Sequence, residues 1–217
     1  QEERFLYLPP GINGKCVRPA NADEIRAAKR RELGVAEEER MLLQVASNYK
    51  LKGGDRSIEA LSSLPESLRK RCRLFFAGVP DGGAGESLAR ELHLERQVVF
   101  LGGRKDVPEL LLAADLLVHP ARNEATGTVL AEAIAAGLPL ISSGVCGFRN
   151  FVEDAGCPVV AEPWNQGAFN RSLAEILEHQ DEYRERALKH ASEVDFCRRA
   201  DVAVDFMEQF AGKSRKK

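Results

Sequence analysis

Short apolar runs alternate along the chain with segments of helical periodicity, and this alternation limits the possible folds more than any other sequence feature. We predict strands at 41–46, 73–77, 98–101, 116–119, 138–142 and 158–161, and helices between them at 55–63, 84–94, 106–114, 128–136 and 147–154. Short strands that alternate with helices of about ten residues indicate βαβ units. Because such crossovers are right-handed, the sequence predicts an α/β fold in which helices cover both faces of a parallel sheet.

The two ends of the chain have different patterns. The first forty residues predict a short strand at 5–8, a turn at 9–11 and a helix at 23–33, and the chain after Pro163 predicts helices at 165–179, 181–195 and 198–211. We therefore assign residues 1–163 to the sheet domain, 164–211 to helices that pack on it, and 212–217 to a disordered tail. Apolar residues at 202, 206 and 210 form a stripe on the last helix, which either packs on this domain or faces a domain that this chain lacks.

Composition excludes several classes of protein. The chain has 217 residues, 44% of them hydrophobic, and a net charge of −2, so we expect a folded core and no nucleic-acid binding. The five cysteines are scattered without a C-x-x-C pair, which favours reduced thiols in the cytoplasm over disulfides or a metal site. No apolar tract approaches the ~18 residues of a membrane span.

Several motifs resemble known sites but fail on inspection. The sequence AGKS at 211–214 lacks the preceding P-loop glycine, since Met207 stands there, and the glycines of 78–86 do not follow the dinucleotide pattern. We interpret 78–86 as a mobile surface loop. The other histidines are expected to be solvated, but His119 ends a predicted strand, where it either makes a structural hydrogen bond or contacts a substrate.

The stretch NEATGTVLAE at 123–132 follows the predicted strand at 116–119 and leads into the helix at 128–136. Ligands of open parallel sheets bind beyond the carboxyl ends of the strands, where such loops enter helices. The first N–H groups of a helix lack partners and carry partial positive charge, so they bind phosphate without a basic side chain. Gly127 has no Cβ and allows close approach. The stretch therefore predicts an anion site near Gly127 and Thr128.

Two carboxylates flank this predicted site, Glu124 in the loop and Glu132 about one turn into the helix. Carboxylates repel phosphates but accept hydrogen bonds from hydroxyls, often two at once from a vicinal diol. A nucleotide sugar, with a central diphosphate and a diol at each end, fits this arrangement. The two carboxylates would then lie about a diphosphate apart, farther than the ~5 to ~9.5 Å of glycosidase acid pairs. Two glutamates eight residues apart are common on solvated helices, so the prediction depends on the surrounding strand, glycine and helix.

At these residues the chain resembles a known family. The segment VFLGGRKDVPELLLAADLLVHPARNEATGTVLAEAIAAGLPLISSGVCGFRNFVED at 99–154 is similar to the nucleotide-binding domain of retaining GT-B glycosyltransferases with the E-x7-E motif, and the similarity extends back to PPGI at 9–12. The resemblance implies that this chain is the C-terminal, Rossmann-like half of a GT-B fold. We expect the acceptor-binding N-terminal domain to be absent, because the chain starts QEERFLYL, and we expect the last helix to reach towards that domain.

The resemblance also implies a role for each matching residue. Glu124 would face the donor sugar, the amides of the following loop would bind the diphosphate, and Glu132 would bind the ribose, near which Val129 would pack. Arg104 would lie against the base and Lys52 on the phosphates. The predicted substrate-binding residues are Lys50, Lys52, Arg104, Glu124, Ala125, Thr126, Gly127, Thr128, Val129 and Glu132, and the predicted catalytic residues are Lys52 and Glu124.

This chain departs from the family at one phosphate-binding position. Relatives carry arginine directly before the Lys-Gly pair or earlier in that loop, and this chain has Leu51 and Ser47 there. Lys50 could substitute as a point charge, but it lacks the bidentate fork of arginine.

The resemblance further implies a substrate and a location. The phrases SIEALSSLPESLR at 57–69, AADLLVHPA at 113–121 and GVCGF at 144–148 are similar to family members of lipopolysaccharide core synthesis. These imply glucose transfer from a UDP-sugar to a heptose of a lipid-linked acceptor, without metal or other cofactor, at the cytoplasmic face of the inner membrane. Galactose or N-acetylhexosamine would use the same glutamates. We expect this domain alone to bind UDP without catalysis; the alternatives are a related synthase or epimerase with a soluble acceptor, or a non-catalytic nucleotide-sugar-binding module.

Overall fold

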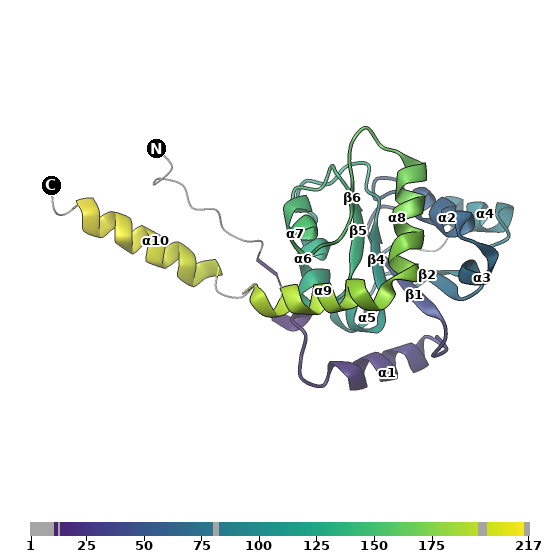
Figure 1. Cartoon of the computed structure of the whole chain (residues 1–217), viewed down its shortest axis with the longest axis horizontal. Coiled ribbons are helices and arrows are strands. Elements are labelled where there is room, and N and C mark those ends of the chain that lie inside the picture. Colours follow the sequence, from purple (N-terminus) through teal and green to yellow (C-terminus); the bar gives the residue numbers. More distant parts are fainter. Residues whose placement is uncertain (1–10, 13, 80–82, 195–198, 215–217) are drawn as a thin grey trace.

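Six parallel strands form one sheet in the order β3-β2-β1-β4-β5-β6 (Figure 1). The computed structural model describes residues 11–12, 14–79, 83–194 and 199–214, and in the last helix the side chains of residues 201–208. The strands are β1 (Arg40–Val45), β2 (Cys72–Ala77), β3 (Val98–Phe100), β4 (Leu116–His119), β5 (Leu140–Ser143) and β6 (Val159–Val160). All six lie within two residues of the predicted runs, and the predicted strand at 5–8 lies outside the described residues.

Helices connect these strands as the periodicity predicts. They are α1 (Ala22–Glu32), α2 (Gly54–Ser63), α3 (Glu66–Arg69), α4 (Gly83–Glu91), α5 (Val107–Ala113), α6 (Thr128–Ala135), α7 (Arg149–Asp154), α8 (Gln166–Glu178), α9 (Gln180–Glu193) and α10 (Arg199–Ser214), with a short 3-10 helix, η2 (Gly14–Cys16). The sequence did not predict η2 or α3. The interpretation of 78–86 as a mobile loop was wrong for its second half, because Gly83 and Gly85 belong to α4. A Cβ on Gly85 would lie 2.6 Å from the Phe100 ring, so this glycine allows α4 to pack on β3.

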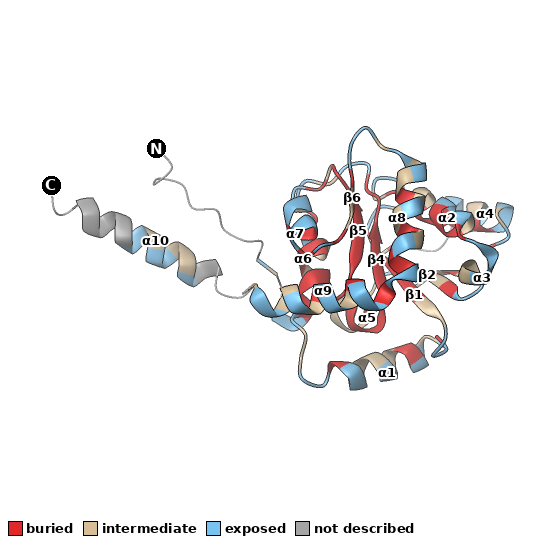
Figure 2. Ribbon diagram, in the orientation of Figure 1, coloured by how far each residue is buried: buried red, intermediate tan, exposed pale blue. Residues whose placement is uncertain are grey.

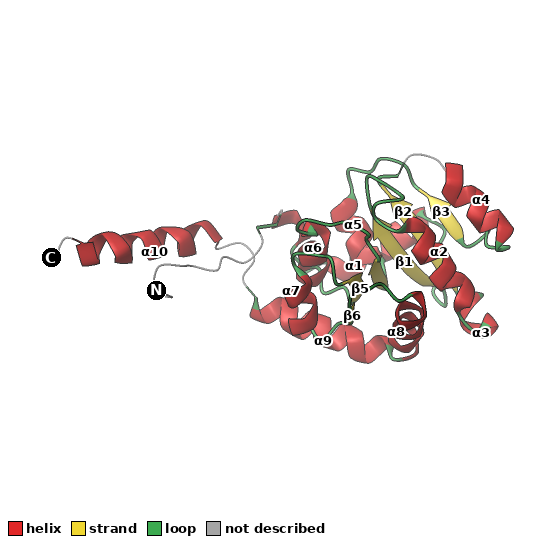
Figure 3. Ribbon diagram, turned by 90° about the horizontal axis from the view of Figure 1, so that it is seen from above, coloured by secondary structure: helices red, strands yellow, loops and turns green. Residues whose placement is uncertain are grey.

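The sheet is buried on both faces, as Figure 2 shows. Successive residues of a strand point to opposite sides, so Leu42 contributes to one hydrophobic cluster and Leu43 to the other. Helices α1, α5, α6 and α7 supply the cluster on one face, and α2, α4 and α8 supply the other; Figure 3 shows these two layers from above. This two-sided burial explains why the strands are continuous apolar runs without polar alternation.

A buried charge fixes α1 beneath the sheet. Asp115, which interrupts the apolar tract before β4, is 3% exposed and accepts hydrogen bonds from Arg26 and Arg30 of α1 at 2.6 and 2.9 Å. The backbone N–H of Met41 donates to the same carboxylate at 2.7 Å. Burial raises the pKa of Asp115, but the two guanidiniums and this amide outweigh burial and lower the pKa below its usual value. This carboxylate is therefore structural.

The C-terminal helices differ in how they contact the domain. Helix α8 packs on α2 and β5, and α9 packs on α6 and α8. Helix α10 stands apart from the sheet in Figures 1 and 3 and continues to Ser214, three residues into the predicted tail. On its stripe Val202 and Phe206 are half-buried and Met207 is 60% exposed, whereas the side chain at 210 lies outside the described residues. That the stripe faces a further domain remains a prediction.

The strand order creates a crevice at one edge of the sheet. From β1 the chain moves outward through β2 and β3, and it then returns to place β4 on the other side of β1. The helices that follow β1 and β4, α2 and α6, therefore lie on opposite faces of the sheet. In open α/β sheets, ligands bind where the order reverses in this way. No helix in the described residues is both long and apolar enough to cross a membrane.

Candidate nucleotide-sugar site

A cavity of about 320 Å³ lies where the strand order reverses. It is lined by residues at and after the ends of β1, β2, β3 and β4, together with the start of α6: Val45, Ala46, Ser47, Lys52, Ala77, Gly78, Arg104, Val107, His119, Glu124, Thr128 and Val129. Half of the ten predicted substrate-binding residues therefore line one cavity: Lys52, Arg104, Glu124, Thr128 and Val129. The other five, Lys50, Ala125, Thr126, Gly127 and Glu132, are not among its lining residues.

The backbone at the start of α6 offers unpaired donors. Gly127 precedes the helix with φ of +82°, and no side chain caps the helix. Within the described part of the chain, no group accepts a hydrogen bond from the backbone N–H of any residue from 124 to 129. These donors lie at the positive end of the helix dipole, so the segment can bind an anion through its backbone.

The segment before α7 holds this loop in place. The amide of Phe148 donates to the carbonyl of Thr126 at 2.9 Å. A Cβ on Gly147 would lie 2.2 Å from the carbonyl oxygen of Ala125, so only glycine allows the two backbones to approach this closely. The segment before α7 therefore packs on the carbonyl side of the loop, and the amide donors of the loop are left unpaired within the described residues.

Glu124 is anchored through one of its two oxygens. Lys52 Nζ lies 2.6 Å from Oε2, and His119 Nε2 lies 3.2 Å from the same atom. The hydrogen bond from His119, followed by that from Lys52, lowers the pKa of Glu124 to about 2 against the opposing effect of burial. The carboxylate is therefore ionised at neutral pH. Oε1 has no hydrogen-bond partner in the described residues, which leaves it available to ligand hydroxyls.

The backbone of Lys52 is fixed by buried polar contacts. The side-chain amide of Gln44, on β1, donates to the Lys52 carbonyl at 2.6 Å, and Ser57 Oγ donates to Gln44 Oε1 at 2.7 Å. Gly53 follows with φ of +68°, and a Cβ there would lie 2.1 Å from the carbonyl oxygen of Pro120. This close approach brings the loop after β1 against the loop after β4, and with it Lys52 against Glu124.

A second ion pair joins the same two loops. Both guanidinium Nη atoms of Arg122 contact the Asp55 carboxylate at 2.6 Å, and the Arg122 amide donates to the Leu51 carbonyl at 2.8 Å. The pKa of Arg122 is raised by this hydrogen bond to Asp55. Arg122 therefore stabilises the contact between the loops and is occupied by Asp55.

Glu132 lies in α6, beyond the unpaired amides of residues 124–129, in a more apolar environment than Glu124. Burial raises its pKa above the usual value. The buried thiol of Cys16, in η2, lies beside it; its own pKa is raised to about 12, first by burial and then by Glu132. The thiol therefore stays protonated and can donate to the carboxylate.

Arg104 and Lys50, two cations that were predicted to bind the ligand, lie in different environments. Arg104 lines the cavity, but its guanidinium already binds Asp106 at 2.5 and 2.7 Å and Glu32 at 3.3 Å. The hydrogen bond to Asp106 is the main cause of its raised pKa. Lys50 is exposed, and its backbone carbonyl accepts from Arg122 at 3.1 Å. The structure shows no contact between the Lys50 ammonium and the other site residues.

Sequence reasoning missed two residues that shape the site and left a third open. Gln44 is a polar residue within an apolar strand, and this departure from the apolar pattern could have identified it from the sequence. Arg122 could be paired with Asp55 only once the two loops were known to touch. For His119 the sequence allows both a structural and a substrate role, and the structure shows the hydrogen bond to Glu124.

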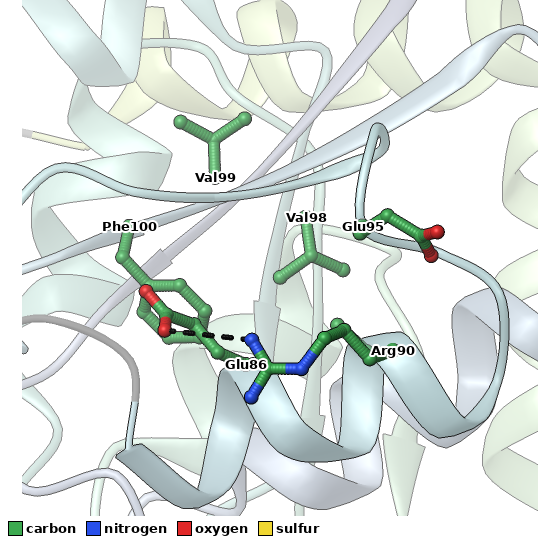
Figure 4. Close-up of a pocket in the computed structure, with 7 residues that line it drawn as sticks. Glu86, Arg90, Glu95, Val98, Val99 and Phe100 are labelled. Atoms are coloured by element: carbon green, nitrogen blue, oxygen red, sulfur yellow. Dashed lines mark ion pairs between the residues drawn. The ribbon is translucent and has the colours of Figure 1, made fainter.

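Another cavity, of about 440 Å³, lies at the free edge of the sheet beside β3 (Figure 4). Glu86 and Arg90, one turn apart on α4, form an ion pair at 3.9 Å on one side of it, facing Val98 and Phe100 of β3. It contains none of the predicted site residues. The described residues also include no group of three or more His, Cys, Asp or Glu side chains placed to hold a metal ion.

Known proteins with similar sequences share this fold. A family model described as glycosyl transferases group 1 matches residues 25–194. The chain is 42% identical to lipopolysaccharide glucosyltransferase WaaG of Escherichia coli K12, over 95% of this chain and 56% of that protein. It is 32% identical to D-inositol 3-phosphate glycosyltransferase of Thermobispora bispora, over 95% and 52% respectively. A crystal structure of WaaG, a glycosyltransferase involved in lipopolysaccharide biosynthesis, matches with a TM-score of 0.83, over 94% of this chain and 56% of that one. The chain thus spans about half the length of these relatives.

Proposed function

Because the chain belongs to the family of glycosyl transferases group 1, with the fold of the C-terminal half of a GT-B enzyme, we propose that it is the donor-binding part of a retaining glycosyltransferase. The observation that carries this proposal is the run of unpaired amides from residue 124 to 129, with Glu124 on one side and Glu132 on the other. A diphosphate on the amides places a sugar at each carboxylate. That geometry matches a nucleotide sugar better than a substrate of hydrolysis.

Each part of the site has one role in this proposal. The amides and Lys52 hold the diphosphate, whose negative charge grows as the sugar–phosphate bond breaks; fixed donors that meet this charge lower the barrier without proton transfer. Glu132 accepts hydrogen bonds from the ribose, and Glu124 accepts them from the transferred sugar. No metal ion or other cofactor takes part.

We propose UDP-glucose as the donor and a heptose of the lipopolysaccharide inner core as the acceptor, at the cytoplasmic face of the inner membrane. The support is the 42% identity to a lipopolysaccharide glucosyltransferase. The acceptor would bind to the part of the protein outside this chain. Relatives such as the D-inositol 3-phosphate glycosyltransferase carry a similar half, so a soluble acceptor is the alternative, and a product assay on the full-length protein distinguishes the two.

Calorimetric titration of this chain with UDP tests the donor site. We expect binding, and we expect Glu132→Gln to weaken it by about 1.5–3 kcal/mol, or about 10- to 150-fold, because a hydrogen bond to a charged group is lost. Glu178→Gln removes the same charge at an exposed position at the end of α8 and should leave the affinity unchanged. Equal affinity of the unmodified chain and Glu132→Gln would reject the ribose role of Glu132. Absence of UDP binding to the unmodified chain would reject the proposed function.

A further inference from the structure

Lys52 and His119 both bind the same oxygen of Glu124, but in the proposed function only Lys52 has a second role, at the donor diphosphate. Lys52 Nζ is 2.6 Å from Oε2, and within the described residues its one other hydrogen bond is to the carbonyl of Asn123 at 3.3 Å. In the proposed function, this ammonium turns to the diphosphate. Its departure takes the closest donor away from Glu124, and the side chain would then be free to change rotamer.

His119 is placed to prevent that movement. It ends β4, is 1% exposed, and its Nε2 lies 3.2 Å from Glu124 Oε2. Glu124 is ionised and can only accept, so Nε2 must carry the proton. The other ring nitrogen, Nδ1, is buried and has no hydrogen-bond partner in the described residues. A second proton there would leave a buried donor unpaired, and the geometry therefore favours the neutral ring with its proton on Nε2.

We infer that His119 is a positioning residue that holds Glu124 Oε2 after Lys52 moves to the donor diphosphate, and so keeps Oε1 directed at the hydroxyls of the transferred sugar. This inference rests on the proposed function and adds a residue to it. His119 is the last residue of β4, pairs with Ser142 of β5 and is buried, so its ring cannot follow Glu124 if the carboxylate drifts.

A neutral donor suits this role better than a cation. An ammonium that stayed on Glu124 Oε2 would be lost to the diphosphate, and its charge would offset the negative charge that attracts the sugar hydroxyls to Oε1. A neutral imidazole N–H fixes one oxygen and leaves the negative charge on the carboxylate. Sugar hydroxyls then donate to a charged acceptor, which makes the stronger class of hydrogen bond.

The difference between UDP and UDP-glucose affinity tests this inference, because only UDP-glucose reaches Glu124. We would titrate this chain with each ligand in the unmodified form, His119→Phe and His119→Gln. Phenylalanine keeps a ring of similar size without the N–H, and glutamine restores an N–H donor. We expect His119→Phe to lower the affinity for UDP-glucose by about tenfold or more, the range for a lost hydrogen bond to a charged group. The affinity for UDP should change by less than about twofold. His119→Gln should recover most of the UDP-glucose affinity. The control variant His179→Phe, at an exposed position, should leave the affinity for both ligands unchanged.

The outcomes separate the two proposals. If the unmodified chain binds neither ligand, the proposed function fails and this inference with it. If the unmodified chain binds UDP, but His119→Phe either leaves the UDP-glucose affinity unchanged or lowers the affinity for both ligands equally, the positioning role is overturned and the donor site stands. Long-range ¹H–¹⁵N spectra of the histidines give a second readout. We expect the His119 signals of a neutral ring protonated on Nε2 with and without UDP-glucose, and a ring protonated on Nδ1 would also overturn the inference.

Discussion

Replacing Gly53 with alanine should damage both the fold and the donor site, and the structure gives the size of the effect. Gly53 has φ of +68° and lies between Lys52 and the first residue of α2. A Cβ at this position would lie 2.1 Å from the carbonyl oxygen of Pro120 and 2.9 Å from its carbonyl carbon. These are backbone atoms in the loop after β4, so no side-chain rotation relieves the overlap, and one of the two loops has to move.

Two costs add in Gly53→Ala. The left-handed conformation costs an alanine about 1–2 kcal/mol, and displacement of packed backbone costs about 1–3 kcal/mol more. Gly34→Ala is the matched control, because Gly34 has φ of +63° but a Cβ there would meet no atom within 4 Å. The control carries only the first cost. We therefore expect the free energy of unfolding to fall by about 1–3 kcal/mol more in Gly53→Ala than in Gly34→Ala.

Urea unfolding of the two variants and the unmodified chain, at equal protein concentration, measures this difference. At this chain length it corresponds to a gap in melting temperature of about 2–4 °C per kcal/mol. Because Lys52 precedes Gly53, UDP affinity should fall in Gly53→Ala and stay unchanged in Gly34→Ala. Two variants of equal stability would refute the close approach of the loops after β1 and β4 as the contact that positions Lys52.

Three further predictions follow from the site. Glu124→Ala should leave UDP affinity of this chain nearly intact while it abolishes sugar transfer in the full-length protein; a collapse of UDP affinity would mean that Glu124 holds the other end of the donor. The pKa of Glu124 is lowered from 4.5 to about 2, so its interactions stabilise the fold above pH ~4.5 and are lost as the pH falls towards ~2. The difference in unfolding free energy between the unmodified chain and Glu124→Gln should shrink across that interval in urea titrations, and a constant difference would contradict the assignment. UDP affinity measured with and without EDTA should be equal, and a loss with EDTA would show that a metal takes part.

Local patterns were sufficient for the six strands and the longer helices, though not for η2 or α3, and for the start of α6. Apolar runs of a few residues predict strands buried on both faces, and Gly127 before an apolar helical pattern predicts the helix start that the structure has at Thr128. The family also followed from contiguous residues, since the segment at 99–154 carries the glycine, both glutamates and their spacing. These features depend on neighbours in sequence, and for that reason the sequence was enough.

Contacts between distant segments needed the tertiary structure. Lys52 and Glu124 are 72 positions apart, and nothing in either segment predicts a 2.6 Å contact between them. Arg104 lines the cavity, but its pairing with Glu32 depends on where α1 packs, whereas Asp106 is only two residues away in sequence.

The sequence alone therefore determined a parallel α/β domain, and it predicted an anion site at the start of α6 with two flanking glutamates. Tertiary structure decided which charges meet there: the strand order places β4 beside β1, and Gly53 lets the loops after them touch. The physical reason is that periodicity and helix-end chemistry act over a few residues, whereas hydrogen bonds and ion pairs depend on distances in space, which only the packing of the sheet defines.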